Sequence, residues 1–298
     1  MKIVFMGTPD FAIPSLKKIH ESKHEVAAVV TAIDKERGRG QKLSYTPVKE
    51  FALQNNILVL QPEKLKDENF ISQLKEINAD LFVIVAFRIL PQEVFTIPKY
   101  GSFNLHGSIL PKYRGAAPIQ WAIINGEKET GVTTFKLAEK VDTGNIYLQD
   151  SILINEDDNF EVIHDKLSLV GADLVLKTLD LIESGNYTLQ QQDNSLASPA
   201  PKITKETGQL NFENTAQEVN NLIRGLSPFP GAYFNHNNKI IKVYKAKVAN
   251  MKLQPGEKKV IGEQLYIGCK EGSIEILELQ QEGRKKMDSS AFLRGYNF

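Results

Sequence analysis

The amino-acid sequence predicts an α/β domain with a mostly parallel sheet, followed by a small barrel of short strands. In the first part of the chain, short apolar runs alternate with amphipathic stretches, as they do when helices connect strands that are buried on both faces. Beyond a polar segment, short strand-like runs follow one another and are separated by glycine, asparagine and proline. These two patterns set the expected order of the elements.

The first domain is expected to alternate strands and helices. Apolar runs predict strands of a parallel sheet at 3–6, 26–31, 57–60, 81–86 and 103–106. Amphipathic spacing predicts helices at 14–22, 47–55 and 68–77, and a long helix at 160–184. Two runs rich in β-branched residues, 131–136 and 146–154, are expected to form a hairpin.

A polar, glutamine-rich segment at 186–205 separates the two parts of the chain. It contains Ser198-Pro199-Ala200-Pro201, which favours an extended backbone. After it, the pattern predicts a helix at 215–224 and strands at 240–248, 260–261, 264–269 and 273–280. We therefore expect one domain at 1–188, a linker at 189–207 and a second domain at 208–298.

Composition places the chain among ordinary globular proteins. It has 298 residues, of which 42% are hydrophobic and 24% charged. The single cysteine, Cys269, excludes a disulfide framework and a cysteine zinc cluster, and it favours a reducing, cytoplasmic location. No apolar run is long enough to span a membrane, and residues 1–7 have the pattern of a strand entering a turn rather than of a targeting peptide.

Charge is unevenly distributed along the chain. Basic and acidic residues balance at 36 each, which alone argues against a nucleic-acid partner. From Gln209 onward, however, 13 basic residues stand against 9 acidic ones. Residues 35–43 form a basic loop with four basic residues, one acidic residue and glycines between them. The barrel and this loop are therefore the places where a phosphate-bearing partner is expected.

The strongest candidate for chemistry lies at the end of the predicted strand at 103–106. Residues two apart in a strand point the same way, so Asn104 and His106 are expected to project together at its carboxyl end, where open α/β sheets place their sites. Asp142, in Val141-Asp142-Thr143-Gly144, is a candidate for orienting His106, although Asp-Thr-Gly is also an ordinary turn. An amide, an imidazole and a carboxylate without a paired nucleophile favour direct transfer between two substrates, with Asn104 and His106 stabilising an oxyanion.

A dinucleotide site is disfavoured. The turn Gly7-Thr8-Pro9 after the first strand could bind an anion at a helix N-terminus, but no GxGxxG follows that strand. Gly38-Arg39-Gly40 lacks a third glycine and a following helix. We interpret the first turn as a tight connection within a parallel sheet.

Two motifs together resemble those of a known family. Asn-Leu-His-Gly-Ser-x-Leu-Pro-x-Tyr-Arg-Gly at 104–115, followed by Val-Asp-Thr-Gly at 141–144, is similar to the 10-formyltetrahydrofolate-dependent formyltransferases. The stretches at 5–12, 115–119 and 228–232 resemble the family members that act on methionyl initiator tRNA. The resemblance runs from the first strand to 292–295, which is essentially the whole chain.

The resemblance implies a Rossmann-like formyltransferase domain, a linker and an OB-like C-terminal barrel that helps to hold tRNA. It implies that a formyl group passes from 10-formyltetrahydrofolate, a co-substrate used without a metal, to the methionine amino group of initiator tRNA for translation initiation. The implied catalytic residues are Asn104, His106 and Asp142. The implied folate contacts are Phe87, Arg88, Ile89, Ser108, Ile109, Leu110 and Pro111, and the implied tRNA contacts are Arg37, Arg39 and Lys42. Arg88 departs from the small or apolar residue expected in the loop that contacts the pterin. A monomer that binds no membrane is expected.

Three alternatives stay open at this point. A sugar-nucleotide formyltransferase would share the Asn-His-Asp set, but the runs at 115–118 and 228–230 argue against it. A formyltetrahydrofolate hydrolase would use water in place of the amine. A non-enzymatic RNA-binding protein would explain the barrel, but it would leave Asn104, His106 and Asp142 without a role.

Overall fold

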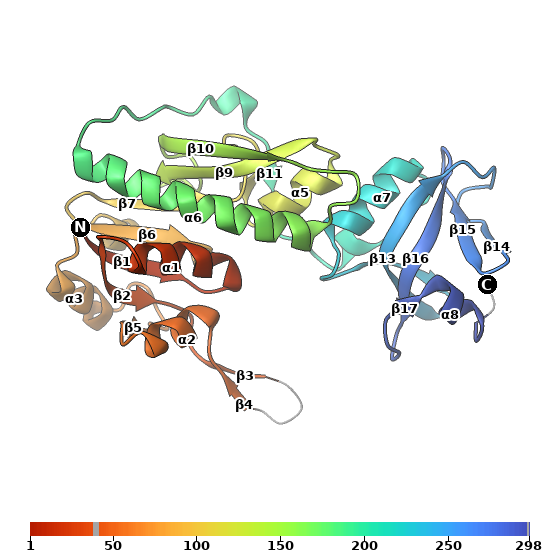
Figure 1. Ribbon diagram of the computed structural model, residues 1–298, viewed down its shortest axis with the longest axis horizontal. Helices are drawn as coiled ribbons and strands as arrows, with labels where there is room; N and C mark the ends of the chain where they lie inside the picture. Colours follow the sequence, from red (N-terminus) through yellow and green to blue (C-terminus); the bar gives the residue numbers. More distant parts are fainter. Residues whose placement is uncertain (38–41, 297) are drawn as a thin grey trace. The chain divides into compact units, whose positions relative to one another are not determined.

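The computed structural model describes residues 1–37, 42–296 and 298, which form two compact units (Figure 1). The first unit comprises Met1–Gly115, Gly131–Ile152 and His164–Pro199. The second comprises Ala116–Thr130, Leu153–Ile163 and Ala200–Phe298. Two short segments that precede the expected linker therefore belong to the second unit, and residues of that linker are divided between both units. The domain boundaries at 188 and 208 stay a prediction.

Within the described residues, the first unit is built on a seven-stranded sheet in the order β10–β9–β7–β6–β1–β2–β5. Its parallel strands are β1 (Lys2–Gly7), β2 (Glu25–Val30), β5 (Leu58–Leu60), β6 (Leu81–Val85) and β7 (Ser102–His106). β9 (Glu129–Lys136) runs antiparallel to β7, and β10 (Ile146–Leu153) forms the edge. The mostly parallel α/β sheet is therefore confirmed.

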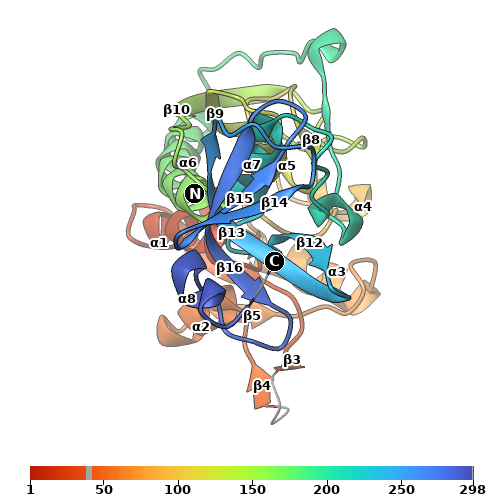
Figure 2. The ribbon, with the colours of Figure 1, turned by 90° about the vertical axis from the view of Figure 1, so that its right-hand side faces the viewer.

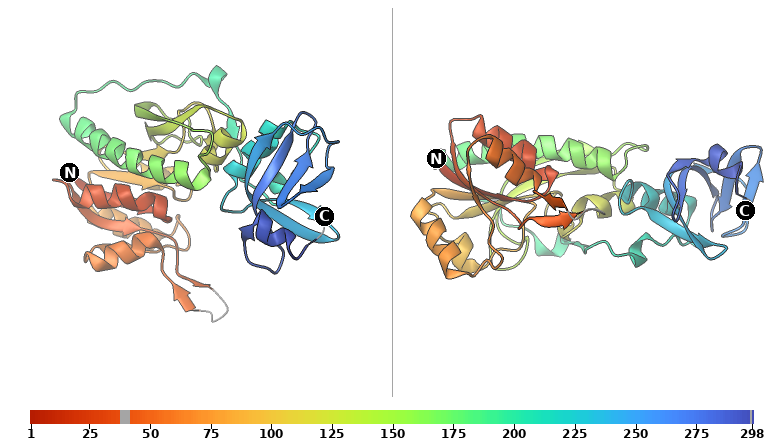
Figure 3. Two further views of the ribbon diagram at one scale, coloured as in Figure 1. Left: turned by 45° about the vertical axis from the view of Figure 1, so that its right-hand side comes forward. Right: turned by 90° about the horizontal axis from the view of Figure 1, so that it is seen from below.

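Helices cover both faces of this sheet, because alternate side chains of its strands point to opposite sides. Figure 3 shows α1 (Ile13–His20) and α6 (Phe160–Ser184) on one face and α3 (Glu68–Ile77) on the other. The face toward α3 and α4 (Gln92–Phe95) carries one apolar cluster, which includes Val4, Met6, Phe82, Ile84, Phe70, Leu74 and Val94. On the other face, α6 comes so close to β7 that a Cβ on Gly171 would lie 2.6 Å from the Leu105 side chain.

Local capping explains where several helices begin. Thr46 precedes α2 (Pro47–Gln54), and its hydroxyl accepts a hydrogen bond from Lys49 N. Asp67 does the same for α3 through Phe70 N. The helices expected at 68–77 and 160–184 begin and end where predicted, and α1 and α2 differ by one or two residues. No helix in the described part of the chain has both the length and the hydropathy that crossing a bilayer requires.

The described ends of the basic segment at 35–43 form two strands where the sequence predicts a loop. β3 (Lys35–Arg37) and β4 (Lys42–Ser44) pair antiparallel, with Arg37 opposite Lys42. Figure 2 shows β3 and β4 extending past α2 and β5. The sequence does not predict the two strands because their charged residues carry no alternating apolar pattern.

The second unit contains an antiparallel sheet of short strands, as expected. Its order is β12 (Ala232–His236), β13 (Lys239–Ala249), β16 (Ser273–Gln281), β15 (Gln264–Gly268) and β14 (Lys258–Ile261), with β17 (Met287–Asp288) paired to β16. The register of β13 shifts twice between Val243 and Ala246, which bends the strand. β12, β17 and α8 (Ser289–Leu293) are missing from the sequence prediction.

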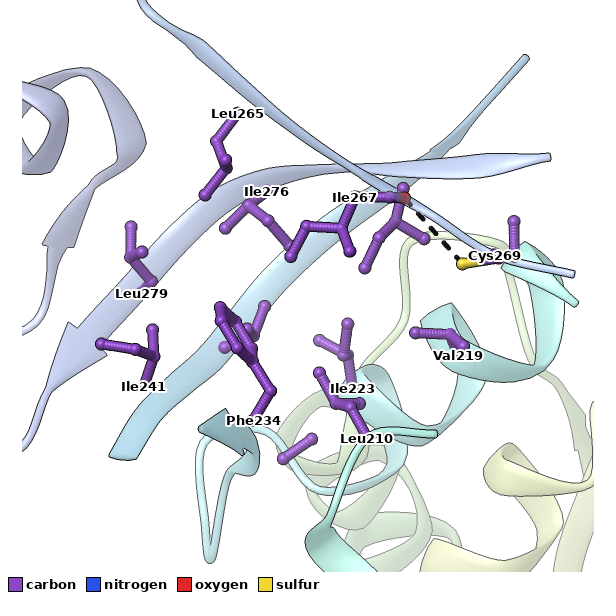
Figure 4. Close-up of a cluster of buried hydrophobic side chains, with 14 of the residues drawn as sticks. Leu210, Val219, Ile223, Phe234, Ile241, Leu265, Ile267, Cys269, Ile276 and Leu279 are labelled. Carbon is purple, nitrogen blue, oxygen red and sulfur yellow. Dashed lines mark hydrogen bonds between the residues drawn. The ribbon is translucent and has the colours of Figure 1, made fainter. Parts of the chain in front are cut away.

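Helix α7 (Ala216–Gly225) closes the core of the second unit. Figure 4 shows Val219 and Ile223 of α7 facing the side chains of Phe234, Ile267 and Ile276 from the sheet. Cys269 lies in the same core, and burial raises the pKa of its thiol to about 11. The thiol is thus a small apolar filler in its neutral form. α5 (Pro118–Ile124) packs beside α7, where Gly225 leaves no room for a Cβ against Ile124.

Replacing Thr215 by alanine is expected to lower the free energy of unfolding by about 1 kcal/mol. The Thr215 hydroxyl accepts from Glu218 N at 3.2 Å while the Glu218 carboxylate accepts from Thr215 N at 2.8 Å, a reciprocal cap at the start of α7. Urea unfolding measures the change. Thr188→Ala, an exposed threonine outside any helix, is the control, and equal stability of the two variants would contradict the prediction.

Candidate active site

Asn104 and His106 lie on one face of β7, at the carboxyl edge of the parallel sheet. Asn104 stands opposite Ile84 of β6 and Phe135 of β9, and His106 stands opposite Thr133. The Phe135 ring meets the imidazole edge-on, with ring centres 6.5 Å apart. His106 is buried, whereas Asn104 is half-buried and, among the described residues, makes no side-chain hydrogen bond. Its amide is therefore available to a bound molecule.

The His106 ring is held from both nitrogens. Nε2 lies 2.8 Å from the Tyr113 carbonyl oxygen. A carbonyl only accepts hydrogen bonds, so Nε2 carries the proton and donates it. Nδ1 faces the Asp142 carboxylate, with Oδ2 at 3.8 Å, which is too long for a hydrogen bond but within the range of electrostatic pairing. The Tyr113 carbonyl and the Asp142 carboxylate therefore orient the ring together.

The turn that carries Asp142 is shaped by close backbone packing. Asp142 has φ of 55°, a left-handed conformation that aspartate tolerates, and its Oδ2 accepts from Gly115 N at 2.9 Å. A Cβ on Gly144 would collide with the carbonyl group of Lys136. The Asp-Thr-Gly run is thus a turn required by packing, and the same turn presents a carboxylate to His106.

The segment with the implied folate contacts Ser108 and Leu110 is fastened by neighbouring strands. The Thr133 hydroxyl donates to Ser108 O at 2.7 Å and accepts from Leu110 N at 3.1 Å. Gln149 of β10 donates to Leu110 O at 2.8 Å. The Ser108 hydroxyl donates back to Lys112 O at 2.6 Å. Ser108 and Leu110 are buried and shape this loop, while Ile109 and Pro111 are partly exposed.

The loop after β6 holds the other implied folate contacts, and Arg88 fastens it. The Arg88 guanidinium donates to Pro62 O at 2.8 Å and to Glu63 O at 3.0 Å, and it lies over the Phe87 ring. A cavity of about 450 Å³ lies beside these carbonyls, lined by residues between 60 and 73. Ile89 is 74% exposed. Arg88 stands where a small or apolar residue is expected, and its side chain joins the loop after β6 to the loop at 62–63, at the same edge of the sheet.

Asp34, Lys49 and Gln61 form a polar cluster next to the start of β3, and the sequence does not predict it. The Lys49 ammonium contacts the Asp34 carboxylate and donates to Gln61 Oε1 at 2.8 Å. Gln61 Nε2 donates to Asp34 Oδ1 at 2.9 Å and to Ala32 O at 2.7 Å. The hydrogen bonds from Lys49 and Gln61 lower the pKa of Asp34 below its usual value. These residues lie far apart in the sequence, and no motif marks them.

Two of the three implied tRNA contacts lie on β3 and β4. Arg37 and Lys42 occupy facing positions on β3 and β4. Arg39 lies outside the described residues.

Within the described residues, one cluster could offer three metal ligands: His24, Asp180 and Glu183. Lys23 already donates to both carboxylates, at 2.9 Å to Asp180 and 2.8 Å to Glu183. A cation of the chain itself therefore neutralises these acids.

Comparison with known proteins places the chain in a family. A model of the formyl transferase family matches residues 1–179, and a model of the formyl transferase C-terminal domain matches residues 202–297. The chain therefore belongs to the formyl transferase family, and the resemblance of its motifs is confirmed. The protein is therefore a transferase that moves a formyl group.

Within this family, the chain is similar over its full length to methionyl-tRNA formyltransferases. The methionyl-tRNA formyltransferase of Caldanaerobacter subterraneus subsp. tengcongensis is 48% identical over 301 residues, covering 100% of this chain and 97% of the relative. That of Geobacter metallireducens is 45% identical over 297 residues, covering 99% and 96%.

Solved structures share the fold. The sugar 3N-formyltransferase WlaRD, determined with dTDP and 5-N-formyl-THF, has a TM-score of 0.71 at 24% identity and covers 96% of this chain and 99% of its own. HypX from Aquifex aeolicus, in complex with tetrahydrofolic acid, has a TM-score of 0.68 at 19% identity and covers 98% and 47%.

Replacing Gly144 by alanine is expected to lower the free energy of unfolding by about 1–3 kcal/mol, because backbone atoms of Lys136 occupy the space that the new methyl group needs. Thermal unfolding measures the loss. Gly295→Ala is the matched control, since nothing lies within 4 Å of a Cβ there. If the two variants unfolded at the same temperature, the close approach at Gly144 would be refuted.

Proposed function

We propose that this enzyme transfers the formyl group of 10-formyltetrahydrofolate to the amino group of methionyl initiator tRNA. The observation that carries the proposal is the free amide of Asn104 beside the buried His106 and its partly buried partner Asp142, at the sheet edge from which the loops after β6 and β7 emerge. The full-length similarity to methionyl-tRNA formyltransferases supports this choice of acceptor.

The geometry supports a direct transfer. The neutral methionyl amine attacks the formyl carbon, and a new C–N bond forms while the carbonyl oxygen becomes an oxyanion. The Asn104 amide donates to that oxyanion, whereas the Nε2–H of His106, which the sequence predicts as a second donor, is already bonded to Tyr113 O. Because Nε2 donates to Tyr113 O, Nδ1 is the nitrogen that carries the lone pair when the His106 ring is neutral, and in that form Nδ1 accepts the proton released by the amine. The Asp142 carboxylate, 3.8 Å away, stabilises the resulting imidazolium.

Collapse of the tetrahedral intermediate completes the reaction. The bond between the formyl carbon and N10 of the folate breaks, and the proton on His106 passes to N10. N-formylmethionyl-tRNA and tetrahydrofolate leave, and His106 returns to its neutral form. The chain itself supplies no covalent nucleophile in this scheme.

We propose that the tRNA is held by the basic segment at 35–43 and by the C-terminal domain. Arg37, Arg39 and Lys42 are the proposed contacts of this segment, and the region from Gln209 onward has an excess of basic residues. The proposed domains are a catalytic part at 1–188 and a tRNA-binding part at 208–298. We further propose that the enzyme is cytoplasmic, because the donor and the acceptor are soluble substrates of translation initiation. We also propose that it acts as a monomer.

The acceptor is tested by supplying 10-formyltetrahydrofolate with methionyl initiator tRNA, methionyl elongator tRNA, a dTDP-linked amino sugar, or no acceptor. Formylation of the initiator tRNA well above the other reactions is expected. Equal release of formate without an acceptor would instead define a hydrolase, and preferred formylation of the sugar would define a sugar formyltransferase. Each of these two outcomes refutes the proposal.

Asn104→Ala is expected to lower kcat by about 100- to 1000-fold, because it removes a donor aimed at the oxyanion. KM for both substrates is expected to stay near the parental value. Steady-state formylation kinetics measure both constants, and circular dichroism checks the fold. Near-normal turnover of a folded variant would remove Asn104 from the catalytic residues.

Arg39→Ala is expected to raise KM for methionyl-tRNA and to reduce the slope of its salt dependence by about 1, as the loss of one phosphate contact does. Lys17→Ala, an exposed lysine on α1, is the charge-matched control and is expected to leave both quantities unchanged. A parental rate for Arg39→Ala at low and high salt would contradict a tRNA contact.

A further inference from the structure

Gln192 lies in the segment that the sequence assigns to a linker, yet its side chain is only 6% exposed. Its Oε1 accepts from Arg114, at 3.1 Å from Nε and 2.7 Å from Nη2. Its Nε2 donates to the carbonyl oxygens of Asp142, at 2.9 Å, and Gly144, at 2.7 Å. Gln192 thus joins the turn that carries Asp142 to the segment that follows the catalytic strand.

The chemistry of this position requires a side-chain amide. A guanidinium only donates hydrogen bonds and backbone carbonyls only accept them. The group between them has to accept on one side and donate on the other, which a carboxylate, an ammonium or an apolar side chain cannot do. A glutamate would place a charged oxygen against two carbonyl oxygens. A methionine would leave the buried carbonyls without their donor.

Three consecutive residues connect Gln192 to the catalytic pair. The Tyr113 carbonyl accepts from His106, Gly115 N donates to Asp142, and the Arg114 side chain between them donates to Gln192. Ser198 fastens the same segment: its hydroxyl accepts from Tyr113 N and its carbonyl from Arg114 N, both at 2.9 Å. Contacts through Gln192 therefore help to set the distance between the imidazole and the carboxylate, together with the direct hydrogen bond from Gly115 N to Asp142.

We propose that Gln192 is a positioning residue for formyl transfer, which holds the Asp142 carboxylate at its place beside His106 Nδ1. The inference rests on the proposed function for the roles of His106 and Asp142. Without the two hydrogen bonds from Nε2, the Asp142–Gly144 turn moves relative to β7. The carboxylate then no longer stabilises the imidazolium where the proton is transferred.

The first test is steady-state kinetics of Gln192→Met, which keeps the side-chain length and removes the hydrogen bonds. We expect kcat to fall about 10- to 100-fold, as misplacing a group that supports catalysis does, with KM for both substrates within about twofold. Asn194→Ala is the matched control. Asn194 accepts from the same Arg114 at 2.8 Å but contacts neither His106 nor the Asp142 turn, so its kcat is expected to stay within about twofold. A kcat of Gln192→Met that matches this control overturns the proposal.

A double-mutant cycle separates positioning from general structural support. In an Asp142→Asn background the carboxylate charge is already lost. Adding Gln192→Met is then expected to lower kcat by less than about threefold, because residues that act through one another are not additive. A further loss as large as in the parental enzyme would show that Gln192 acts by another route and would refute the inference.

The imidazole gives a readout that needs no acceptor. The chain has five histidines, so ring nitrogen-15 NMR signals can be assigned with a His106→Gln variant. The parental enzyme is expected to show His106 with its proton on Nε2, and Gln192→Met is expected to show a changed His106 signal with the other four unchanged. An unchanged His106 signal overturns the proposal, whatever acceptor the enzyme uses. If Gln192→Met does not fold, Gln192→Glu, which retains the bond to Arg114, is expected to give the same change.

Discussion

The hydrogen bond from His106 Nε2 to the Tyr113 carbonyl is the interaction on which the site depends. A buried imidazole needs a partner for its N–H, and the carbonyl at 2.8 Å supplies one. The bond selects one tautomer and thereby leaves Nδ1 free to face Asp142. It also ties Tyr113 back to the end of the strand that the chain has just left.

The parallel sheet brings the loops that surround this hydrogen bond to one edge. β6 and β7 are neighbours and parallel, so their following loops emerge at the same edge. Arg88 joins the first of these loops to the carbonyls at 62–63, and Thr133 and Gln149 hold the second. The backbone of β9 approaches the Asp142 turn so closely that only glycine fits at position 144. Side chains at this edge therefore project from rigid supports, as catalysis by oriented donors requires.

The sequence predicts the parts of the fold that local patterns specify. Helix α3 has strong apolar periodicity, and α6 is long with a broad apolar face. The placement of Asn104 and His106 follows from the two-residue repeat of a strand. Asp142 is a candidate for orienting His106 from the sequence, and the family resemblance supports that role. The sequence alone does not separate it from an ordinary Asp-Thr-Gly turn, because a loop reaches its place by tertiary contacts. Gln192 could not be predicted, since it lies 50 residues from Asp142 in a polar, glutamine-rich stretch. The short strands β3, β4, β12 and β17 were missed because pairing, rather than their own composition, stabilises them.

The burial of Cys269 has a practical consequence. The chain has no other cysteine, and this thiol lies in the core of the second unit, with its pKa raised by burial to about 11. Reagents that attack thiolates will therefore leave the folded parental enzyme unmodified. A cysteine introduced at any exposed position becomes the single reactive thiol of the molecule. Because the native thiol does not react, a fluorescent label or cross-linker attached to an introduced cysteine would report where the acceptor nucleic acid lies.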